Sequence, residues 1–324
     1  MSSNMPVLVG DVGGTNARFA VARLDPFRIE QRLDLPADNF ASFEAVLTAY
    51  LDHLGPENRP CDAAIGVAGP VTAGQVKFTN RDWQASEDGL RKLGFKRALL
   101  INDFAAAAFS VTALQPNDLH IIGPKLDGLP GEPITIMGAG TGFGVSCLAR
   151  FRGVSLPIAT EGGHAAFAPR NAEQMEVLRI LARRFGHVSN ERILSGPGIA
   201  NIHAALTEIA GNAPAELSAA EISQQAETGD GICCAAIEMF CEVFGAVAGD
   251  LALIHGARGG VYIAGGIAKK IEKTLVNSAF RAAFENKGRM SYYVKAIPTY
   301  LIMHEDSAFL GAALAIEKFG TSGT

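Results

Sequence analysis

The 324-residue chain contains no run of lysine and arginine, and its net charge is −5. Nucleic-acid backbones are bound by clustered positive charge, so this composition argues against such a partner. The five cysteines form no Cys-x-x-Cys pair and have no metal-ligand spacing. An odd number of cysteines in a long chain argues against a disulfide framework and indicates a reducing compartment.

Targeting and membrane signals are also lacking. The N-terminal apolar run has no basic segment before it and is broken by Asp11, so no secretory signal is expected. The apolar stretch 237–254 is interrupted by three acidic residues, which argues against a membrane span. We therefore expect a cytoplasmic protein with no membrane partner. Hydrophobic residues at 48% and charged residues at 19% are typical of a globular protein, and the length suggests two domains.

The sequence has no Gly-Lys dipeptide, which excludes a Walker A phosphate loop. Glycine itself is abundant, with 36 residues, or about one in nine, where about 7% is usual. Three glycine-rich turns follow apolar runs, at 10–15, 138–144 and 265–266. The middle turn is not a dinucleotide fingerprint, because Phe143 occupies its final glycine position and a strand follows instead of a helix.

The first third of the chain alternates between strand and helix patterns. Residues 6–24 predict a strand, a tight glycine turn and a second strand, and residues 28–36 predict a third strand. Apolar residues recur at helical spacing from Phe43 to Leu54. Further strands are predicted at 62–69, 75–80 and 97–103, with a short helix at 86–94. This alternation is typical of an α/β domain.

A second segment starts near Ala113 and repeats this beginning. Residues 133–150 predict a strand, a glycine turn with a threonine, and a second strand. Helices are then predicted at 172–185, 198–209, 218–226 and 231–255. Residues 259–273 predict a strand, a Gly-Gly turn and the start of a helix. A strand at 299–304 and a last helix at 307–319 follow. We predict a small α/β domain of residues 1–112, with the C-terminal segment 305–324 packing back on it, and a larger α+β domain of residues 113–304.

The glycine turns are candidates for phosphate binding. One such turn alone is most often only a hairpin connection. Here two strand–Gly–Thr–strand units begin the two halves, and paired hairpins can offer backbone N–H groups and threonine hydroxyls to a triphosphate. Asp11 would repel a bare phosphate, but it would attract Mg²⁺, which keeps several waters and accepts carboxylate ligands.

Six segments, in order, resemble those of one family. "GDVGGTNAR", "GAGTGFG" and "GGVYIAGGIA" are similar to the two phosphate segments and the adenosine segment of the actin-like ATPase (ribonuclease H-like) fold of sugar kinases. "INDFAAAAF", "ATEGGHAAFAP" and "HVSNERILSGPG" resemble the sugar-binding segments of bacterial ATP-dependent glucokinases. The resemblance extends from Val7 to "DSAFLGAALA" near the C-terminus. It implies two domains around a cleft, and transfer of the ATP γ-phosphoryl group to the 6-hydroxyl of D-glucose, which feeds glycolysis.

The resemblance is to the zinc-free branch of these kinases. The branch that contains repressors as well as kinases carries a cysteine-rich zinc loop after a segment similar to "EGGH". The corresponding "EGGHAAFAPRNAEQME" contains no cysteine, so no structural zinc is expected. The implied cofactors are ATP and its Mg²⁺. The family also favours a homodimer, and symmetric dimers are the commonest soluble assembly.

Asp103 is the candidate general base, because phosphoryl transfer to an alcohol needs a carboxylate within reach of the attacking hydroxyl. Position alone leaves a second interpretation, in which Asp103 is the N-cap of the following helix. The resemblance implies catalysis by Asp103 and sugar binding by Asn80, Asn102, Asp103, Glu161, His164 and Glu191. Without it, Glu191 is interpreted as a solvated surface acid, and Glu161 with His164 gives only two ligands for a metal site, which is weak evidence.

The resemblance also assigns the three glycine-rich turns to the nucleotide. The predicted nucleotide-binding residues are Gly10, Asp11, Val12, Gly13, Gly14 and Thr15 in the first turn, Gly140, Thr141 and Gly142 in the second, and Gly265 and Gly266 beside the adenosine. Asp11 is the candidate metal ligand.

Two other functions remain open. The first is a kinase for mannose, fructose or an N-acetyl hexosamine, because epimers differ by only a few hydrogen bonds. The second is a sugar-sensing regulator or chaperone-like ATPase on the same fold, which would not need Asp103 beside a sugar pocket. The sequence also leaves open whether ADP or polyphosphate replaces ATP as the donor.

Overall fold

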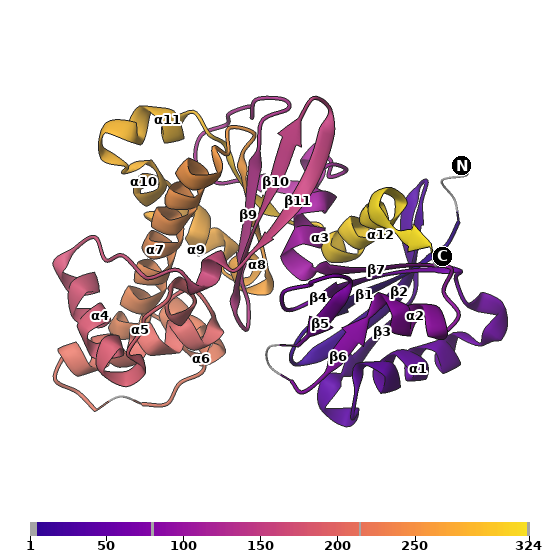
Figure 1. The fold of residues 1–324 in the computed structure, drawn as a ribbon. Helices are drawn as coiled ribbons and strands as arrows, with labels where there is room; N and C mark the ends of the chain where they lie inside the picture. The colour runs from indigo at the N-terminus through magenta and orange to yellow at the C-terminus, as the bar shows by residue number, and fades with distance from the viewer. Residues whose placement is uncertain (1–4, 79–80, 214, 323–324) are drawn as a thin grey trace. The chain divides into compact units, whose positions relative to one another are not determined.

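The structure is a computed structural model that describes residues 5–78, 81–213 and 215–322. Its contacts divide the chain into two compact units (Figure 1). Unit 1 consists of Met1–Pro116, Ser155–Ala159 and His304–Thr324, and unit 2 of Asn117–Val154 and Thr160–Met303. The chain thus passes between the units at 116/117 and 303/304, beside the predicted boundaries at 112/113 and 304/305, and also around 155–159.

Unit 1 is built on a six-stranded sheet in the order β14-β7-β4-β1-β2-β3. The strands are β1 (Val7–Val12), β2 (Asn16–Leu24), β3 (Phe27–Pro36), β4 (Asp62–Val67), β7 (Arg97–Asn102) and β14 (Thr321–Ser322). β1, β4 and β7 are parallel, whereas β2 and β3 extend the sheet in antiparallel pairing. Val12 pairs in register with Val67, and Val67 with Asn102, so the ends of the three parallel strands share one edge.

Helices cover both faces of this sheet. α1 (Phe43–Leu54) and α2 (Glu87–Lys92) lie on one face, and α3 (Asp103–Ser110) and α12 (Ser307–Phe319) on the other (Figure 1). The predicted apolar face of α1 is confirmed, since all of its members are buried: Phe43, Val46, Leu47, Tyr50, Leu51 and Leu54. The sequence predicts a strand over 75–80; β5 (Gln75–Lys77), which pairs with β6 (Gln84–Ser86), ends before Phe78, and residues 79 and 80 lie outside the described residues.

A second six-stranded sheet, of order β11-β10-β9-β12-β13-β8, repeats the same plan. It belongs to unit 2 except for residues 155–159 of β11, which group with unit 1. Its strands are β8 (Leu119–Ile121), β9 (Ile134–Ala139), β10 (Phe143–Phe151), β11 (Val154–Thr160), β12 (Val261–Ala264) and β13 (Thr299–Ile302). β9 and β10 form an antiparallel hairpin, and β12 pairs in parallel with β9 and β13. The sequence did not predict β11, because Pro157 interrupts it; proline is tolerated at an edge strand, which is where β11 lies.

The helices of unit 2 are α4 (Ala172–Phe185), α5 (Gly196–Ile209), α6 (Ala219–Glu227), α7 (Gly231–His255), α8 (Gly266–Lys270), α9 (Glu272–Asn277), α10 (Phe280–Glu285) and α11 (Ser291–Lys295). α5 starts two residues before its predicted position, because the Ser195 hydroxyl accepts a hydrogen bond from Gly198 N and caps the helix. α7 is long and apolar enough to cross a membrane by length and composition, but 67% of its apolar window is buried inside the protein. Packing in the unit 2 core accounts for this apolarity.

The contact between α3 and α12 gives a test of unit 1. A Cβ at Gly311 of α12 would lie 1.8 Å from the Ala106 carbonyl oxygen of α3. We expect Gly311→Ala to lower the free energy of unfolding by about 2 kcal/mol or more, because overpacking outweighs the better helix propensity of alanine. Urea unfolding measures this change. The control is Gly231→Ala in α7, where a Cβ meets nothing within 4 Å; a loss of equal size there would contradict the packing explanation.

Candidate functional site

The first glycine turn joins β1 to β2 at the sheet edge of unit 1. Gly13 N donates to Asn16 O at 3.0 Å, and Thr15 O accepts from Ala37 N at 3.0 Å. Within the described residues, the N–H groups of Gly14 and Thr15 have no acceptor. A Cβ at Gly13 would meet only Asn16 O, at 3.9 Å, so the turn is open at Gly13, while Arg81 Nε donates to Gly14 O. These backbone donors are therefore available to an anion.

Gly10 and Val12, which are also assigned to this turn, lie in β1 and are packed within unit 1. Gly10 lies inside β1, and a Cβ there would be 2.8 Å from Ile65 Cδ1, so close packing accounts for this glycine. Val12 is fully buried at the end of β1. Only the backbone of these two residues is suited to face a ligand.

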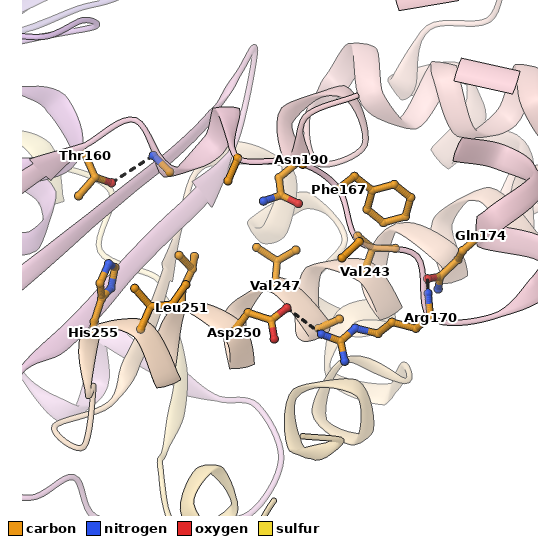
Figure 2. A pocket seen from close by; sticks show the side chains of 16 residues that line it. Thr160, Phe167, Arg170, Gln174, Asn190, Val243, Val247, Asp250, Leu251 and His255 are labelled. Carbon is orange, nitrogen blue, oxygen red and sulfur yellow. Dashed lines mark hydrogen bonds and ion pairs between the residues drawn. The ribbon is translucent and has the colours of Figure 1, made fainter. Parts of the chain in front are cut away.

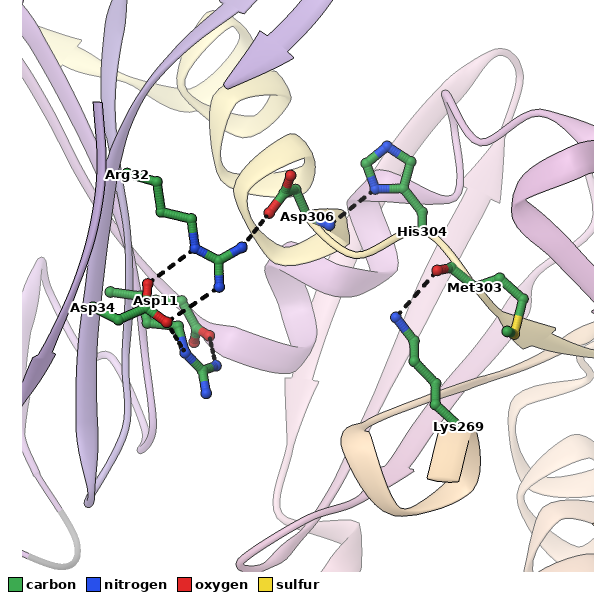
Figure 3. A network of polar contacts seen from close by, with 8 residues as sticks. Asp11, Arg32, Asp34, Lys269, Met303, His304 and Asp306 are labelled. Atoms are coloured by element: carbon green, nitrogen blue, oxygen red, sulfur yellow. Dashed lines mark hydrogen bonds and ion pairs between the residues drawn. The ribbon is translucent and has the colours of Figure 1, made fainter. Parts of the chain in front are cut away.

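Asp11 begins a row of charges that alternate in sign across unit 1. Asp11 pairs in register with Arg18, and Arg18 with Asp34. Arg18 Nη1 donates to Asp11 Oδ2 at 3.1 Å, and Arg18 Nε lies 3.5 Å from Asp34 Oδ2. Arg32 then bridges Asp34 and Asp306, with Nη1 donating to Asp306 Oδ1 at 3.0 Å (Figure 3). The row thus connects the first glycine turn to Asp306, the residue before α12.

The environment of Asp11 suits a cation. Burial raises the pKa of Asp11 above its ordinary value, while the Arg18 guanidinium acts in the opposite direction. The Asp11 side chain is 25% exposed, and a guanidinium already occupies one carboxylate oxygen. Among the described residues no cluster of three potential metal ligands exists. One carboxylate fits Mg²⁺ that arrives with a nucleotide, because such Mg²⁺ takes its remaining ligands from phosphates and water.

The junction of β7 and α3 tests the interpretation of Asp103 as the N-cap. Asn102 is the N-cap of α3, since its Oδ1 accepts from Ala105 N at 3.1 Å and its Nδ2 donates to Gly69 O at 3.3 Å. Asp103 is the first residue of the helix, and its Oδ1 accepts from Phe104 N at 2.9 Å. The interpretation of Asp103 as the N-cap is therefore wrong. Asp103 follows β7, two strands from β1, which places it about 10 Å along the sheet edge from the first turn.

The other two glycine-rich turns lie side by side in unit 2. Thr141 is exposed between β9 and β10, and a Cβ at Gly140 would meet nothing within 4 Å. Gly138 pairs in register with Ala264, so the turn after β12 follows beside the turn after β9. Gly265 has φ +91°, and a Cβ there would lie 2.5 Å from the Ala139 carbonyl oxygen, whereas Gly266 is open. Gly265 is required by the backbone, and Gly266 is accessible.

Glu191 is tied to the second turn. Its Oε2 accepts from Phe143 N at 2.9 Å, and a Cβ at Gly142 would be 2.6 Å from the same oxygen. Gly196 N, at the start of α5, donates to Gly140 O at 2.8 Å. The interpretation of Glu191 as a solvated surface acid is wrong, because its carboxylate fixes the start of β10.

Glu161 and His164 flank a short turn that packs on the same strand. A Cβ at Gly163 would lie 1.9 Å from the Phe143 carbonyl oxygen, so only glycine fits there. The side chains of Glu161 and His164 are 57% and 56% exposed, with Oε2 and Nε2 3.9 Å apart. Asn190 N donates to Ala165 O at 2.8 Å and joins this turn to the segment of Glu191.

The structure thus groups the assigned residues within each unit. Unit 1 brings Asp11, the open turn, Asn102 and Asp103 to one sheet edge, and unit 2 brings Glu161, His164 and Glu191 around Phe143, beside the second turn. Asn80 lies outside the described residues. Sequence reasoning missed Arg18 and the backbone of Phe143. The paired positions of Asp11 and Arg18 in the predicted hairpin carried a signal for the first, whereas nothing in the sequence marked the second.

Comparisons with known proteins agree along the whole chain. A family model described as Glucokinase matches residues 8–319. The chain is 47% identical over 317 residues to a glucokinase of Caulobacter sp. (strain K31), covering 97% of this chain and 95% of that protein. It is 40% identical over 317 residues to a glucokinase of Xanthomonas campestris pv. campestris (strain 8004), covering 95% and 94%.

Solved structures show the same likeness. The crystal structure of a glucokinase from an Antarctic psychrotroph has a TM-score of 0.84 and 37% identity, covering 96% of this chain and 98% of that one. A ROK family glucokinase from Streptomyces griseus, in complex with glucose and AMPPNP, has a TM-score of 0.65 at 19% identity, with coverage of 95% and 98%, and so shares the fold. Two sheets of one plan, each with a glycine-turn hairpin beside parallel strands, define a two-domain sugar kinase of the actin-like ATPase fold. The chain belongs to the glucokinase family.

The Asp11–Arg18 pair can be tested directly. We expect Arg18→Gln to raise the pKa of Asp11 further, because the variant removes the cation that favours the carboxylate while the burial remains. NMR titration of the Asp11 carboxyl carbon measures this pKa. Arg23→Gln is the matched control, since Arg23 lies on the same strand and pairs with Glu30. An unchanged Asp11 titration in Arg18→Gln would mean that the pair does not form in solution.

Proposed function

We propose that the protein is an ATP-dependent glucokinase, which transfers the γ-phosphoryl group of ATP to the 6-hydroxyl of D-glucose and releases glucose 6-phosphate and ADP. One observation carries the proposal: in a member of the glucokinase family, Asp103 stands at the same sheet edge as an open glycine turn. A phosphoryl acceptor needs such a carboxylate, and a phosphoryl donor needs such a turn.

Asp103 accepts the proton of the attacking hydroxyl in this mechanism, a role worth about 10²–10⁴-fold in rate. Glu161 and Glu191 offer carboxylate acceptors to the sugar hydroxyls, and His164 offers a ring nitrogen. Asn102 keeps one Nδ2 hydrogen for the sugar, because its cap uses the oxygen and its bond to Gly69 uses the other hydrogen. Asn80 is proposed as a further sugar contact on the resemblance alone.

The N–H groups of Gly14 and Thr15 would face phosphate oxygens, and the turn at 140–142 would do so from unit 2. The open Gly266 backbone would lie against the adenosine. Asp11 would hold the Mg²⁺, directly or through water, after Arg18 releases its oxygen. When bound, Mg²⁺ neutralises the charge that develops on the phosphate oxygens.

Glucose and ATP are favoured over other substrates by the names of the relatives. The Caulobacter and Xanthomonas relatives at 40–47% identity are glucokinases, and the Streptomyces griseus relative was solved with glucose and AMPPNP. A putative N-acetylmannosamine kinase from Listeria monocytogenes shares only the fold, at 16% identity. A coupled assay with glucose, mannose, fructose and N-acetylglucosamine, each with ATP, ADP and polyphosphate, tests the choice. Turnover of another hexose without turnover of glucose would refute the proposal.

The proposal includes a cytoplasmic location and a role at the entry of glucose into glycolysis. The unpaired cysteines support the location, since all five are free thiols. ATP and phosphorylated sugars belong to the same compartment.

We also propose a homodimer. β11 forms an edge of the second six-stranded sheet, and alternate residues of this strand form one apolar stripe. The members of this β11 stripe are Val154, Leu156 and Ile158, which are 58%, 51% and 44% exposed. Apolar edge strands are usually covered, and a second copy of the same strand satisfies a two-fold axis.

Native mass spectrometry tests the dimer. We expect the wild-type chain to have twice the monomer mass, and Leu156→Lys to shift the population to monomer, because a buried unpaired charge opposes the interface. Leu129→Lys is the control, since Leu129 is 42% exposed and lies outside β11. A dimer that survives Leu156→Lys would place the interface elsewhere.

Replacement of the base tests the mechanism. We expect Asp103→Asn to lower kcat by about 10²–10⁴-fold while ATP and glucose still bind, because asparagine keeps the shape but accepts no proton. Rapid-quench turnover and calorimetric binding measure the two properties. Asp52→Asn, at an exposed acid on α1, should leave both unchanged. Near-normal turnover in Asp103→Asn would remove this residue from the role of base.

A further inference from the structure

A cavity of about 390 Å³ lies inside unit 2, between α7 and the segments that carry the assigned sugar residues (Figure 2). Its volume is within the range of small-molecule sites. Thr160, Gly162 and Asn190 line it, so it borders both the turn of Glu161 and His164 and the segment of Glu191. The opposite wall is α7, which contributes Val243, Val247 and Leu251 as well as Asp250 and His255.

Asn190 is the unusual member of this lining. It is only 7% exposed, and its side chain points into the cavity toward Val247 (Figure 2). Within the described residues, its side-chain amide has no hydrogen-bond partner. Among the described residues, the only fully buried side-chain N or O atom without a partner is Arg91 Nε, so the Asn190 amide is reached from the cavity. Its donor and acceptor are therefore open to a small molecule that enters the cavity.

Each of the other polar side chains of the lining already makes at least one hydrogen bond. Thr160 Oγ1 donates to Val145 O, and His255 Nδ1 lies 2.8 Å from Thr135 Oγ1. Gln174 uses both ends of its amide, because Oε1 accepts from Arg170 N and Nε2 donates to Glu242 Oε2.

The charged groups at the cavity also already form ion pairs, with two cations on one carboxylate. Asp250 Oδ2 accepts from Arg170 Nη2 at 2.7 Å, and Asp250 Oδ1 accepts from Lys287 Nζ at 2.7 Å. Arg170 Nη1 donates to Asn286 O at 3.2 Å. An ionic ligand would have to break these pairs or remain unpaired in an apolar space, which is unfavourable.

We propose that this cavity binds a small uncharged molecule with an apolar body and a carboxamide or lactam edge. Such an edge has a donor and an acceptor side by side and complements both halves of the Asn190 amide. The apolar body would pack against Val247, Leu251 and Phe167.

Occupancy of the cavity would change the affinity for sugar. Asn190 precedes Glu191, and Asn190 N donates to Ala165 O, one residue after His164. A ligand held by Asn190 therefore acts on the backbone that carries three assigned sugar residues. This second part rests on the proposed glucokinase function, whereas binding to the cavity does not.

The probes for binding are 4-fluorobenzamide, 4-fluorobenzoate and fluorobenzene. All three contain the fluorophenyl ring; the first two have the same shape and differ in charge, and the third lacks the polar edge. Titration by ¹⁹F NMR on the full chain without sugar gives each Kd. We expect the amide to bind about tenfold more tightly than the benzoate or fluorobenzene, as two hydrogen bonds imply. Equal affinities for the three probes would overturn the proposal.

Two variants locate the site. Asn190→Leu should weaken the affinity for 4-fluorobenzamide by about tenfold and leave the affinity for fluorobenzene unchanged. Val247→Trp should abolish binding of both probes by filling the cavity. Asn212→Leu, at an exposed asparagine after α5, is the control and should bind like wild type. An Asn190→Leu protein that keeps the preference for the amide would refute the site. A folded Val247→Trp protein that still binds both probes would also refute the site.

The link to sugar is measured separately. Calorimetric glucose affinity, with and without saturating 4-fluorobenzamide, should differ by about threefold or more in wild type and be equal in Val247→Trp. Probe binding with unchanged glucose affinity would overturn the regulatory part. Absence of glucose binding in every sample would instead count against the proposed function.

Discussion

The ligand-facing part of unit 2 depends on the backbone of one residue, Phe143. Its N–H donates to the Glu191 carboxylate, and its carbonyl oxygen lies where a side chain on Gly163 would have to be. These two contacts hold a phosphate-type turn, the turn of Glu161 and His164, and the segment before α5 against the start of β10. A shift of β10 by even one residue would separate all three, because alternate residues of a strand face opposite sides of the sheet.

Most elements were predictable because their local signals agree with their packing. α1 and α7 have apolar residues at helical spacing, and β1, β4 and β9 are short apolar runs that end at glycine or proline turns. β11 was not predictable, because Pro157 argues against a strand and only its position at the sheet edge makes proline acceptable. The end of β5 likewise depends on where β6 stops pairing with it.

The candidate site was predictable in its residues but not in its connections. The glycine turns, Asp103 and the "EGGH" segment carry signals of residue type and spacing. The division of roles at the start of α3 could not be predicted, since both Asn102 and Asp103 are good N-caps and only the backbone decides which side chain faces Ala105 N. The same holds for Glu191, whose partner is a backbone N–H from a strand 48 residues earlier in the chain.

The turn at 161–164 has a consequence for how sugar preference can change. Its path is set by glycine backbone packing on β10, while the Glu161 and His164 side chains are more than half exposed and contribute little to holding it. Backbone atoms therefore set the path of the turn, whereas side-chain atoms would contact the hydroxyl groups of a ligand. Substitution of these exposed side chains would change the preference among sugars that differ in their hydroxyl groups, without disturbing the core. A fold built in this way can acquire a new sugar by point changes on an unaltered loop.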